Sequence, residues 1–235
     1  VRLRMNKFEL SLGQNKNPNE DGELSLEEKS IVERIEKMDA DDHSKALLIL
    51  TWKGLKSVSE FEFKNYDVED DPARLEHRRE MEALVADMGL YAHREEDKLD
   101  GQRYDKKGEA TPVIFYRDSY AVAKNKEDLK YFVVHFGKEE NYETTKRLGE
   151  ILGYPETAIE AWNTTDRSST LLKTKIENPE LYARDEMAFA KFRLSKEHWV
   201  KEFETIKNWA NEIKHIDPNL YERIVENRRR ILANE

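Results

Sequence analysis

The sequence predicts an α+β fold, with a small antiparallel sheet that has helices on one face, followed by a helical C-terminal part. Residues 57–63 alternate between apolar and acidic or polar side chains, which is typical of a half-buried strand. After Gly137 the apolar residues recur only at helical spacing. We therefore expect a flexible tail over residues 1–24, an α+β part over residues 25–138 and a helical part over residues 139–235. The last two parts form either separate units or one continuous domain.

Two helices are predicted at the start of the α+β part. Ser25 and Glu28 form a capping box, which begins the first helix. Asp41 or Asp42 caps the second helix, and Gly54 supplies the left-handed residue that ends it. This second helix is apolar nearly all round, so we expect it at the centre of a core.

Strand patterns and two further helices complete the α+β part. Asp71-Pro72 begins one helix, because proline suits the first helical position. Asn125 caps the other, which Gly137 ends. Strands are expected at residues 57–63, 90–93, 112–117 and 120–123, with a long polar loop over residues 95–111 and a turn at Asp118-Ser119.

The helical part is divided by proline, glycine and capping residues. Gly153 ends one helix and Pro155 begins the next. Residues 163–170 read as a polar linker. Further helices are predicted to begin at Asn178-Pro179, at Ser195 and at Asp217-Pro218.

Composition excludes several functional classes. The chain has 235 residues, a formal charge of −9 and no cysteine, so disulfides, thiolate catalysis and zinc fingers are excluded. Of this charge, −8 falls within residues 1–110, which disfavours nucleic acid and anionic membranes as partners. No apolar run is long enough to cross a membrane, and the first residues show no secretory signal. We therefore expect a cytoplasmic protein.

The common catalytic and nucleotide-binding motifs are also missing. The sequence contains no GxGxxG, GxxxxGK[ST], HExxH or GxSxG pattern. It has only nine glycines, and four of them follow predicted helices (Gly54, Gly89, Gly137 and Gly153). We predict no cofactor, and a nucleotide-binding enzyme of a standard kind is disfavoured.

The densest cluster of metal-ligand types lies around His93 and Glu95, with His77 in the preceding helix. In a strand, His93 and Glu95 share a face, so both side chains can point toward one ion. Arg94 lies between them, however, and charged stretches are common in this chain. A solvated sheet edge is therefore the favoured interpretation, with metal binding as the alternative.

Two other histidines are candidates for acid–base chemistry. His135 lies in the otherwise apolar stretch YFVVHF, and His198 lies near the start of the longest amphipathic helix. Acid–base catalysis requires a titratable group whose pKa is shifted by its surroundings. A histidine on an apolar helix is more often a hydrogen-bonded core residue.

The segment around Tyr154 carries the most distinctive local pattern. A helix that ends at Gly153 and a new one at Pro155 place Tyr154 at a corner of fixed angle. That geometry is a sufficient structural reason for the pattern. The start of the new helix also offers free N–H groups to an anion, and Trp162 follows on the same helix.

The stretch Leu152-Gly153-Tyr154-Pro155 is similar to the hallmark of an uncharacterised prokaryotic family, in which a pair of cysteines follows this element. Here Thr157 and Ala158 occupy the cysteine positions, and Ser195 stands where the family often has a further cysteine. The resemblance extends over residues 120–225. It implies the same architecture, but any metal or redox chemistry of those cysteines is lost from this chain.

The leading hypothesis from the sequence is a binding or interaction module, not an enzyme. Its predicted contact surface is the groove between the sheet and the helical part, near His135, Tyr154, Pro155, Trp162 and His198. One alternative is an enzyme that acts on a small or nucleotide-like anionic substrate, with His135 or His198 as acid–base. Another is a structural partner in a larger assembly, in which the acidic N-terminal half meets a basic protein.

Overall fold

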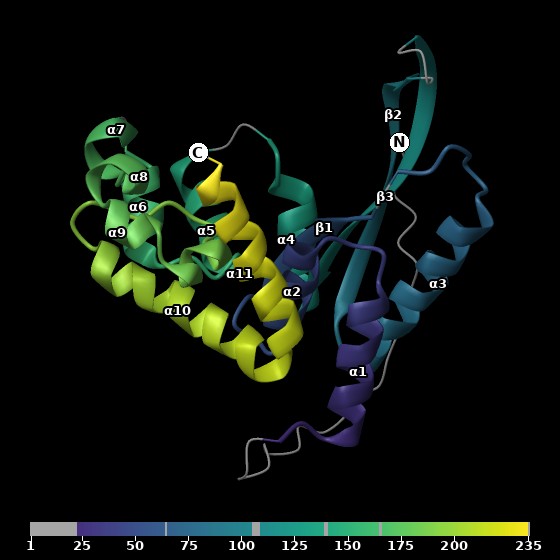
Figure 1. Cartoon of the computed structure of the whole chain (residues 1–235), viewed down its shortest axis with the longest axis horizontal. Helices are drawn as coiled ribbons and strands as arrows, with labels where there is room; N and C mark the ends of the chain where they lie inside the picture. The colour runs from purple at the N-terminus through teal and green to yellow at the C-terminus, as the bar shows by residue number, and fades with distance from the viewer. Residues whose placement is uncertain (1–22, 64, 105–108, 139–140, 165, 235) are drawn as a thin grey trace.

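The computed structural model describes residues 23–63, 65–104, 109–138, 141–164 and 166–234, and Figure 1 shows its arrangement. The predicted tail over residues 1–24 lies almost entirely outside these ranges. The α+β class is confirmed: a three-stranded antiparallel sheet lies beside a helical C-terminal part. Among the described residues, no helix is both long enough and apolar enough to span a bilayer.

The first helices form as their capping residues predict. Helix α1 (Leu26–Lys37) begins at the Ser25–Glu28 capping box, in which both reciprocal hydrogen bonds are present. Helix α2 (Asp42–Trp52) is capped by Asp41, whose side chain accepts from the Ser44 N–H at 3.0 Å. As predicted, Gly54 adopts a left-handed conformation after α2.

The sheet has the strand order β1-β3-β2. Strand β1 (Val58–Glu62) pairs with the final part of β3 (Ala110–Ala123). Strand β2 (Tyr91–Tyr104) pairs with β3 along its whole length, from Tyr91 opposite Ala123 to Tyr104 opposite Ala110.

The polar loop predicted over residues 95–111 is wrong at every described residue except Glu109, which lies between the two strands. Residues 95–104 continue β2 and residues 110–111 begin β3, while residues 105–108 lie outside the described part. The predicted turn at Asp118-Ser119 is also wrong, because both residues lie within β3. The polar residues of β2 lie opposite residues of β3, and such cross-strand pairs stabilise the extended strands. A pattern of alternating apolar residues does not reveal this pairing.

The two faces of the sheet are covered differently. Phe61, Tyr120 and Val122 share a cluster with residues of α1, α2 and α3 (Pro72–Asp87). On the opposite face, Ala121 packs with Phe132 of helix α4 (Lys126–His135). Helices α1 to α3 therefore lie on one face of the sheet, as predicted, but α4 lies on the other face, so the prediction that all helices of this part share one face is wrong for α4.

The helical part contains several short helices and two long ones. The short helices are α5 (Tyr142–Ile151), α6 (Glu156–Trp162), α7 (Arg167–Thr170), α8 (Thr174–Glu177), α9 (Pro179–Tyr182) and the 3₁₀ helix η1 (Asp185–Phe189). The long ones are α10 (Trp199–Ile216) and α11 (Pro218–Ala233). Asn178 and Asp217 cap α9 and α11 as predicted. Helix α10 begins four residues after Ser195, and Ser195 Oγ accepts from the His198 N–H at 3.0 Å.

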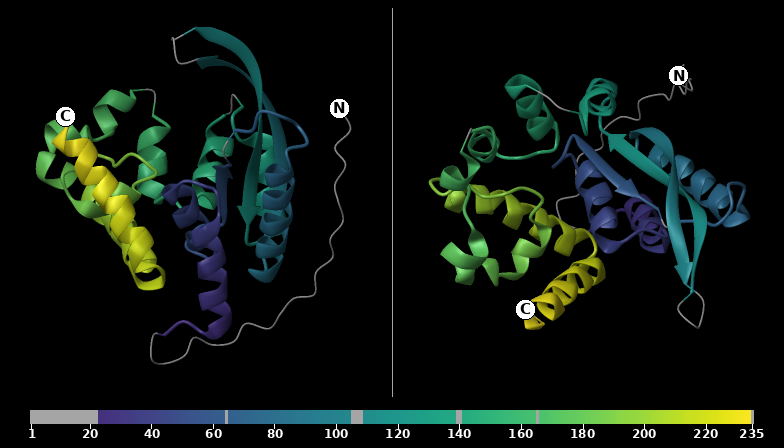
Figure 2. Two further views of the ribbon diagram at one scale, coloured as in Figure 1. Left: turned by 45° about the vertical axis from the view of Figure 1, so that its right-hand side comes forward. Right: turned by 90° about the horizontal axis from the view of Figure 1, so that it is seen from above.

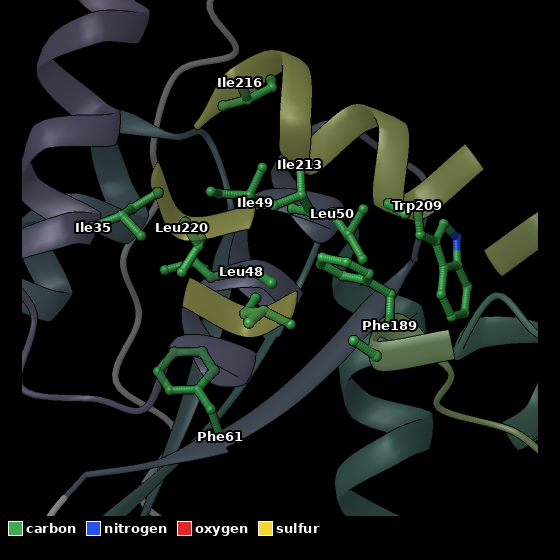
Figure 3. Close-up of a cluster of buried hydrophobic side chains, with 14 of the residues drawn as sticks. Ile35, Leu48, Ile49, Leu50, Phe61, Phe189, Trp209, Ile213, Ile216 and Leu220 are labelled. Atoms are coloured by element: carbon green, nitrogen blue, oxygen red, sulfur yellow. The ribbon is translucent and has the colours of Figure 1, made fainter. Parts of the chain in front are cut away.

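One hydrophobic cluster spans the two parts of the chain. Figure 3 shows Leu48, Ile49 and Leu50 of α2 beside Trp209 and Ile213 of α10. Helix α2 is therefore central to the core, as its apolar surface predicted. Ion pairs also connect α11 to the first two helices. Arg223 of α11 lies 2.9 Å from Glu36 of α1 and 3.0 Å from Asp42 of α2.

Candidate functional site

Tyr154 belongs to a packed seam between the sheet side and the helical part. Its ring lies 5.4 Å from that of Phe192, and the Lys56 ammonium group lies 5.0 Å from the Tyr154 ring centroid. The same ammonium group is 4.4 Å from the Trp209 ring centroid and donates to the Leu152 carbonyl. The corner predicted at Tyr154 is therefore present, but its side chain packs inward.

Lys56 is the most unusual titratable group in this seam. Its side chain is almost wholly buried beneath two aromatic rings. Burial, together with the nearby charge of Lys191, lowers the pKa of Lys56 to about 7. This burial could not be predicted from the sequence, because nothing local to Lys56 distinguishes it from the many surface lysines.

The other residues of the predicted groove lie at separate places. Trp162 is partly exposed at the end of α6, beside the guanidinium groups of Arg167 (4.2 Å) and Arg193 (5.7 Å). His135 lies at the end of α4, with its ring 4.4 Å from that of Tyr131. His198 precedes α10 with an exposed side chain, and Pro155 precedes the short helix α6. Neither of the two hollows described below gathers these groups.

The positions that the family resemblance assigned to cysteines meet at a buried carboxylate. Glu202 of α10 accepts hydrogen bonds from the Thr157 hydroxyl at 2.7 Å and from the Ser195 hydroxyl at 2.7 Å. It also accepts from the Ser195 N–H at 2.6 Å. Ala158 is buried in the adjoining turn of α6. The fold thus brings Thr157 and Ser195 together, and hydrogen bonds to Glu202 connect them.

The metal candidates are divided between the two faces of the sheet. His93 Nε2 lies 3.3 Å from Glu95 Oε1 on the face that α4 partly covers. His77 lies on the opposite face, where its ring stacks on Phe63 and its Nδ1 is hydrogen-bonded to the Tyr66 hydroxyl. Within the described ranges, no three side chains of metal-ligand type are arranged to hold an ion. His77 therefore does not join His93 and Glu95.

Two small hollows lie near the histidines. One, of about 60 Å³, is lined by Glu60, His93 and Glu95 of the sheet and by Phe132 and Phe136 of α4. Burial and the neighbouring carboxylates raise the pKa of Glu60 above its usual range. The other hollow, of about 90 Å³, lies between His43, Tyr182 and the end of α11. Each is much smaller than the roughly 300–1,000 Å³ typical of ligand pockets.

The most prominent feature of the surface is the part of the β2–β3 ribbon that extends past the body of the protein (Figures 1 and 2). We call residues 97–104 and 110–116 the arm. Strand β1 pairs only with residues 119–123 of β3, and one further bridge joins Tyr66 to Tyr116. From Tyr116 toward the far end of the arm, the described parts of β2 and β3 pair only with each other.

The base of the arm is held by a cluster of charges on the face that carries α3. Asp118 of β3 accepts hydrogen bonds from Arg74 at 3.1 Å, from Arg78 at 2.8 Å and from Arg94 at 2.9 Å. Glu96 of β2 pairs with Arg74 at 3.0 Å and with Arg78 at 2.8 Å. Asp118 and Arg74 are buried, and these hydrogen bonds lower the pKa of Asp118. The arm therefore projects from a fixed base.

One edge of the arm is available for pairing along its length. In β3, the backbone groups of Tyr116 and Asp118 bond toward the β1 side. Backbone direction alternates along an antiparallel strand, so the odd-numbered residues of β3 bond β2. The odd-numbered residues of β3 lie opposite odd-numbered residues of β2; Phe115, for example, lies opposite Leu99. The N–H and C=O groups of Lys98 and Asp100 therefore point away from the sheet.

The arm also carries apolar side chains at partly exposed positions. Leu99, Val113 and Phe115 lie on one face of the ribbon and are partly exposed. The Phe115 ring covers Gly101, where an added Cβ would lie 2.5 Å from a ring carbon. Ile114 points to the other face and is 51% exposed. The arm was not predicted from the sequence, although the apolar run from Val113 to Phe115 lies in the strand expected at residues 112–117.

Comparisons with known proteins give no assignment: no protein-family model, no curated protein and no solved structure matches this chain. The resemblance at the Tyr154 corner therefore remains a prediction.

Proposed function

We propose that this protein is an interaction module that binds another polypeptide through the arm. The observation that carries the proposal is the free edge of β2, at which Lys98 and Asp100 direct backbone donors and acceptors outward. An added strand satisfies such groups, and the side chains beside them supply specificity. The predicted class of function is thus kept, and the contact surface is moved from the Tyr154 groove to the arm.

The attachment of the arm to the rest of the protein supports this role. A two-stranded ribbon by itself is only marginally stable in water. Here the arginine cluster around Asp118 fixes its base, and the ring of Phe115 covers Gly101 further out. A partner strand therefore meets a preformed edge, which reduces the ordering cost of binding.

Site-specific crosslinking tests the proposal directly, because the chain contains no cysteine. We suggest attaching a thiol-reactive photocrosslinker to the cysteine of the Ile114→Cys variant, in the arm. The Val200→Cys variant, with the cysteine in α10, is the control. The two positions are similarly exposed, at 51% and 59%. We expect covalent adducts with a polypeptide from Ile114→Cys and none from Val200→Cys. Equal labelling from both positions would contradict the proposal.

A proline substitution at the edge sharpens this test. Lys98→Pro removes an outward N–H without removing a β2–β3 hydrogen bond, and edge strands tolerate proline at such positions. It should abolish the Ile114→Cys adducts while thermal unfolding stays nearly unchanged. Persistence of the adducts in this variant would show that strand addition at β2 is not the binding mode.

A further inference from the structure

The charge pattern along β2 specifies a partner for the arm. We propose that the strand added to β2 is β2 of a second copy of this chain, in an antiparallel register centred on Leu99. This inference rests on the proposed function, because it identifies the polypeptide that the arm binds. It concerns only residues 94–104, whose backbone is described throughout.

The backbone geometry allows such a pairing. The outward-facing backbone groups belong to the even-numbered residues of β2. A twofold axis at Leu99 places Lys98 opposite Asp100 of the second copy and Glu96 opposite Gln102. Both pairs join even-numbered residues, and at Lys98 and Asp100 the outward-facing donors of one strand meet the outward-facing acceptors of the other.

The side chains are complementary in this register. Lys98 faces Asp100 of the second copy, and Glu95 faces Arg103, each pair occurring twice by symmetry. Within the described part of one chain the ion pairs of these side chains are partly or fully exposed, and the Lys98 ammonium also lies 5.3 Å from the Tyr116 ring centroid. Lys98 lies 3.4 Å from Glu69, Glu95 lies 3.3 Å from His93, and Arg103 pairs with Asp67. Exposed pairs contribute little, so exchanging them costs little.

Neighbouring registers are disfavoured by repulsion. An axis at Asp97, Lys98 or Asp100 would place that charged residue directly opposite its own copy. The axis at Lys98 would additionally set Glu96 against Asp100. Like charges directly opposite each other destabilise a strand pair. Centring on Leu99 avoids these contacts and keeps residues 94–104 paired.

The same register completes an apolar row. Leu99 lies opposite Phe115 within one chain. With the axis at Leu99, the two Leu99 side chains are adjacent, and a Phe115 ring flanks each of them. The antiparallel arrangement places the bodies of the two copies at opposite ends of the paired segments.

A charge exchange across the axis tests both the dimer and its register. Lys98→Asp alone sets two acidic residues against each other at both symmetry-related places, and Asp100→Lys alone does the same with two lysines. Each single change should raise the dimer dissociation constant about tenfold or more. The combined Lys98→Asp/Asp100→Lys chain should restore the original constant. Lys201→Asp, on the exposed surface of α10, is the matched control and should change nothing.

The measurement is sedimentation equilibrium of the full chain over a concentration series, with thermal unfolding of each variant as a check on folding. A chain that stays monomeric throughout overturns self-pairing. A dimer that the combined exchange fails to rescue overturns the Leu99 register. A monomer that still gives Ile114→Cys adducts with a different polypeptide leaves the proposed function standing. A monomer without such adducts overturns both.

Discussion

Asp118 of β3 and Arg74 of α3 form a two-point ion pair in the interior of the protein. Arg74 Nε and Nη2 donate to the two carboxylate oxygens of Asp118, each at 3.1 Å, and both side chains are buried. The positions are 44 residues apart in sequence. The pair fixes α3 against the strand that continues into the arm, so it links the stability of the body to the position of the interaction edge.

Asp118→Ala should lower the free energy of unfolding by about 3–5 kcal/mol, because it leaves the buried Arg74 charge without its main partner. Chemical denaturation measures this loss. Glu62→Ala is the control, since Glu62 pairs with Arg117 at a much more exposed site, and it should cost less than about 1 kcal/mol. Similar losses for the two variants would contradict the anchoring role.

The contribution of Asp118 should depend on pH. Its pKa in the folded state is lowered below the ordinary value of 3.8. A depressed carboxyl pKa stabilises the folded state above the unfolded value, and this stabilisation is lost as pH falls through the folded pKa. The stability gap between wild type and Asp118→Ala should therefore narrow in acid. A gap that stays constant down to strongly acidic pH would be inconsistent with this account.

Lys56 should produce the opposite pH dependence. Its folded pKa is about 7, below the ordinary value of 10.5. Between these values the unfolded chain binds a proton that the folded chain releases, so wild-type stability should rise as pH increases from about 7 to 10.5. Lys56→Met should flatten that rise and stabilise the protein by about 1–3 kcal/mol at or below pH 7.

Thermal and denaturant unfolding across this pH range, compared between Lys56→Met and Lys53→Met, measures the Lys56 effect. Lys53 lies nearby, but it pairs with Glu28 at 2.7 Å. If both variants keep the wild-type pH slope, Lys56 is not the group responsible.

The Glu202 network should contribute substantially to stability. Glu202→Ala leaves the donors of Thr157 and Ser195 without their acceptor in a buried site, so we expect a loss of about 2–4 kcal/mol. Glu204→Ala, on the exposed side of α10, should cost less than about 0.5 kcal/mol. Denaturant titration of the two variants measures both changes in the free energy of unfolding. Near-equal changes would contradict a stabilising role for the Glu202 network.

The corner at Gly153 should tolerate alanine less well than other left-handed glycines. At Gly153 φ is +76°, and an added Cβ would lie 2.8 Å from the Leu55 carbonyl oxygen. Gly89 has a φ of +64° and open space around it. Gly89→Ala should cost about 1–2 kcal/mol from backbone strain. Gly153→Ala should cost about 1–3 kcal/mol more because of the contact. Differential scanning calorimetry of both variants would reveal the difference, and equal melting temperatures would refute it.

Most helix boundaries could be predicted from neighbouring residues. Features that depend on residues far apart in the sequence could not. The capping box at Ser25, the Asp217 cap and the Gly153–Pro155 corner depend on neighbouring residues, so the sequence reveals them. Residues 97–104 of the arm lack apolar alternation, so the sequence predicts a loop there, while residues 112–116 lie in a predicted strand; the structure pairs the two segments. Lys56 was missed because its burial depends on Trp209, far away in the chain.

The sequence by itself therefore determined the α+β class, the central apolar helix α2, the caps of α1, α2 and α11, and the corner at Gly153 and Pro155. These features follow from side-chain periodicity and from backbone preferences within a few residues. The predicted linker over residues 163–170 is wrong at residues 167–170, which form α7, and Ser195 does not cap α10. Only the tertiary structure decided that residues 95–104 form a strand, that His77 and His93 lie on opposite faces, and that Thr157 and Ser195 meet at Glu202. Such relationships depend on which distant segments pack together, and local side-chain patterns do not reveal that packing.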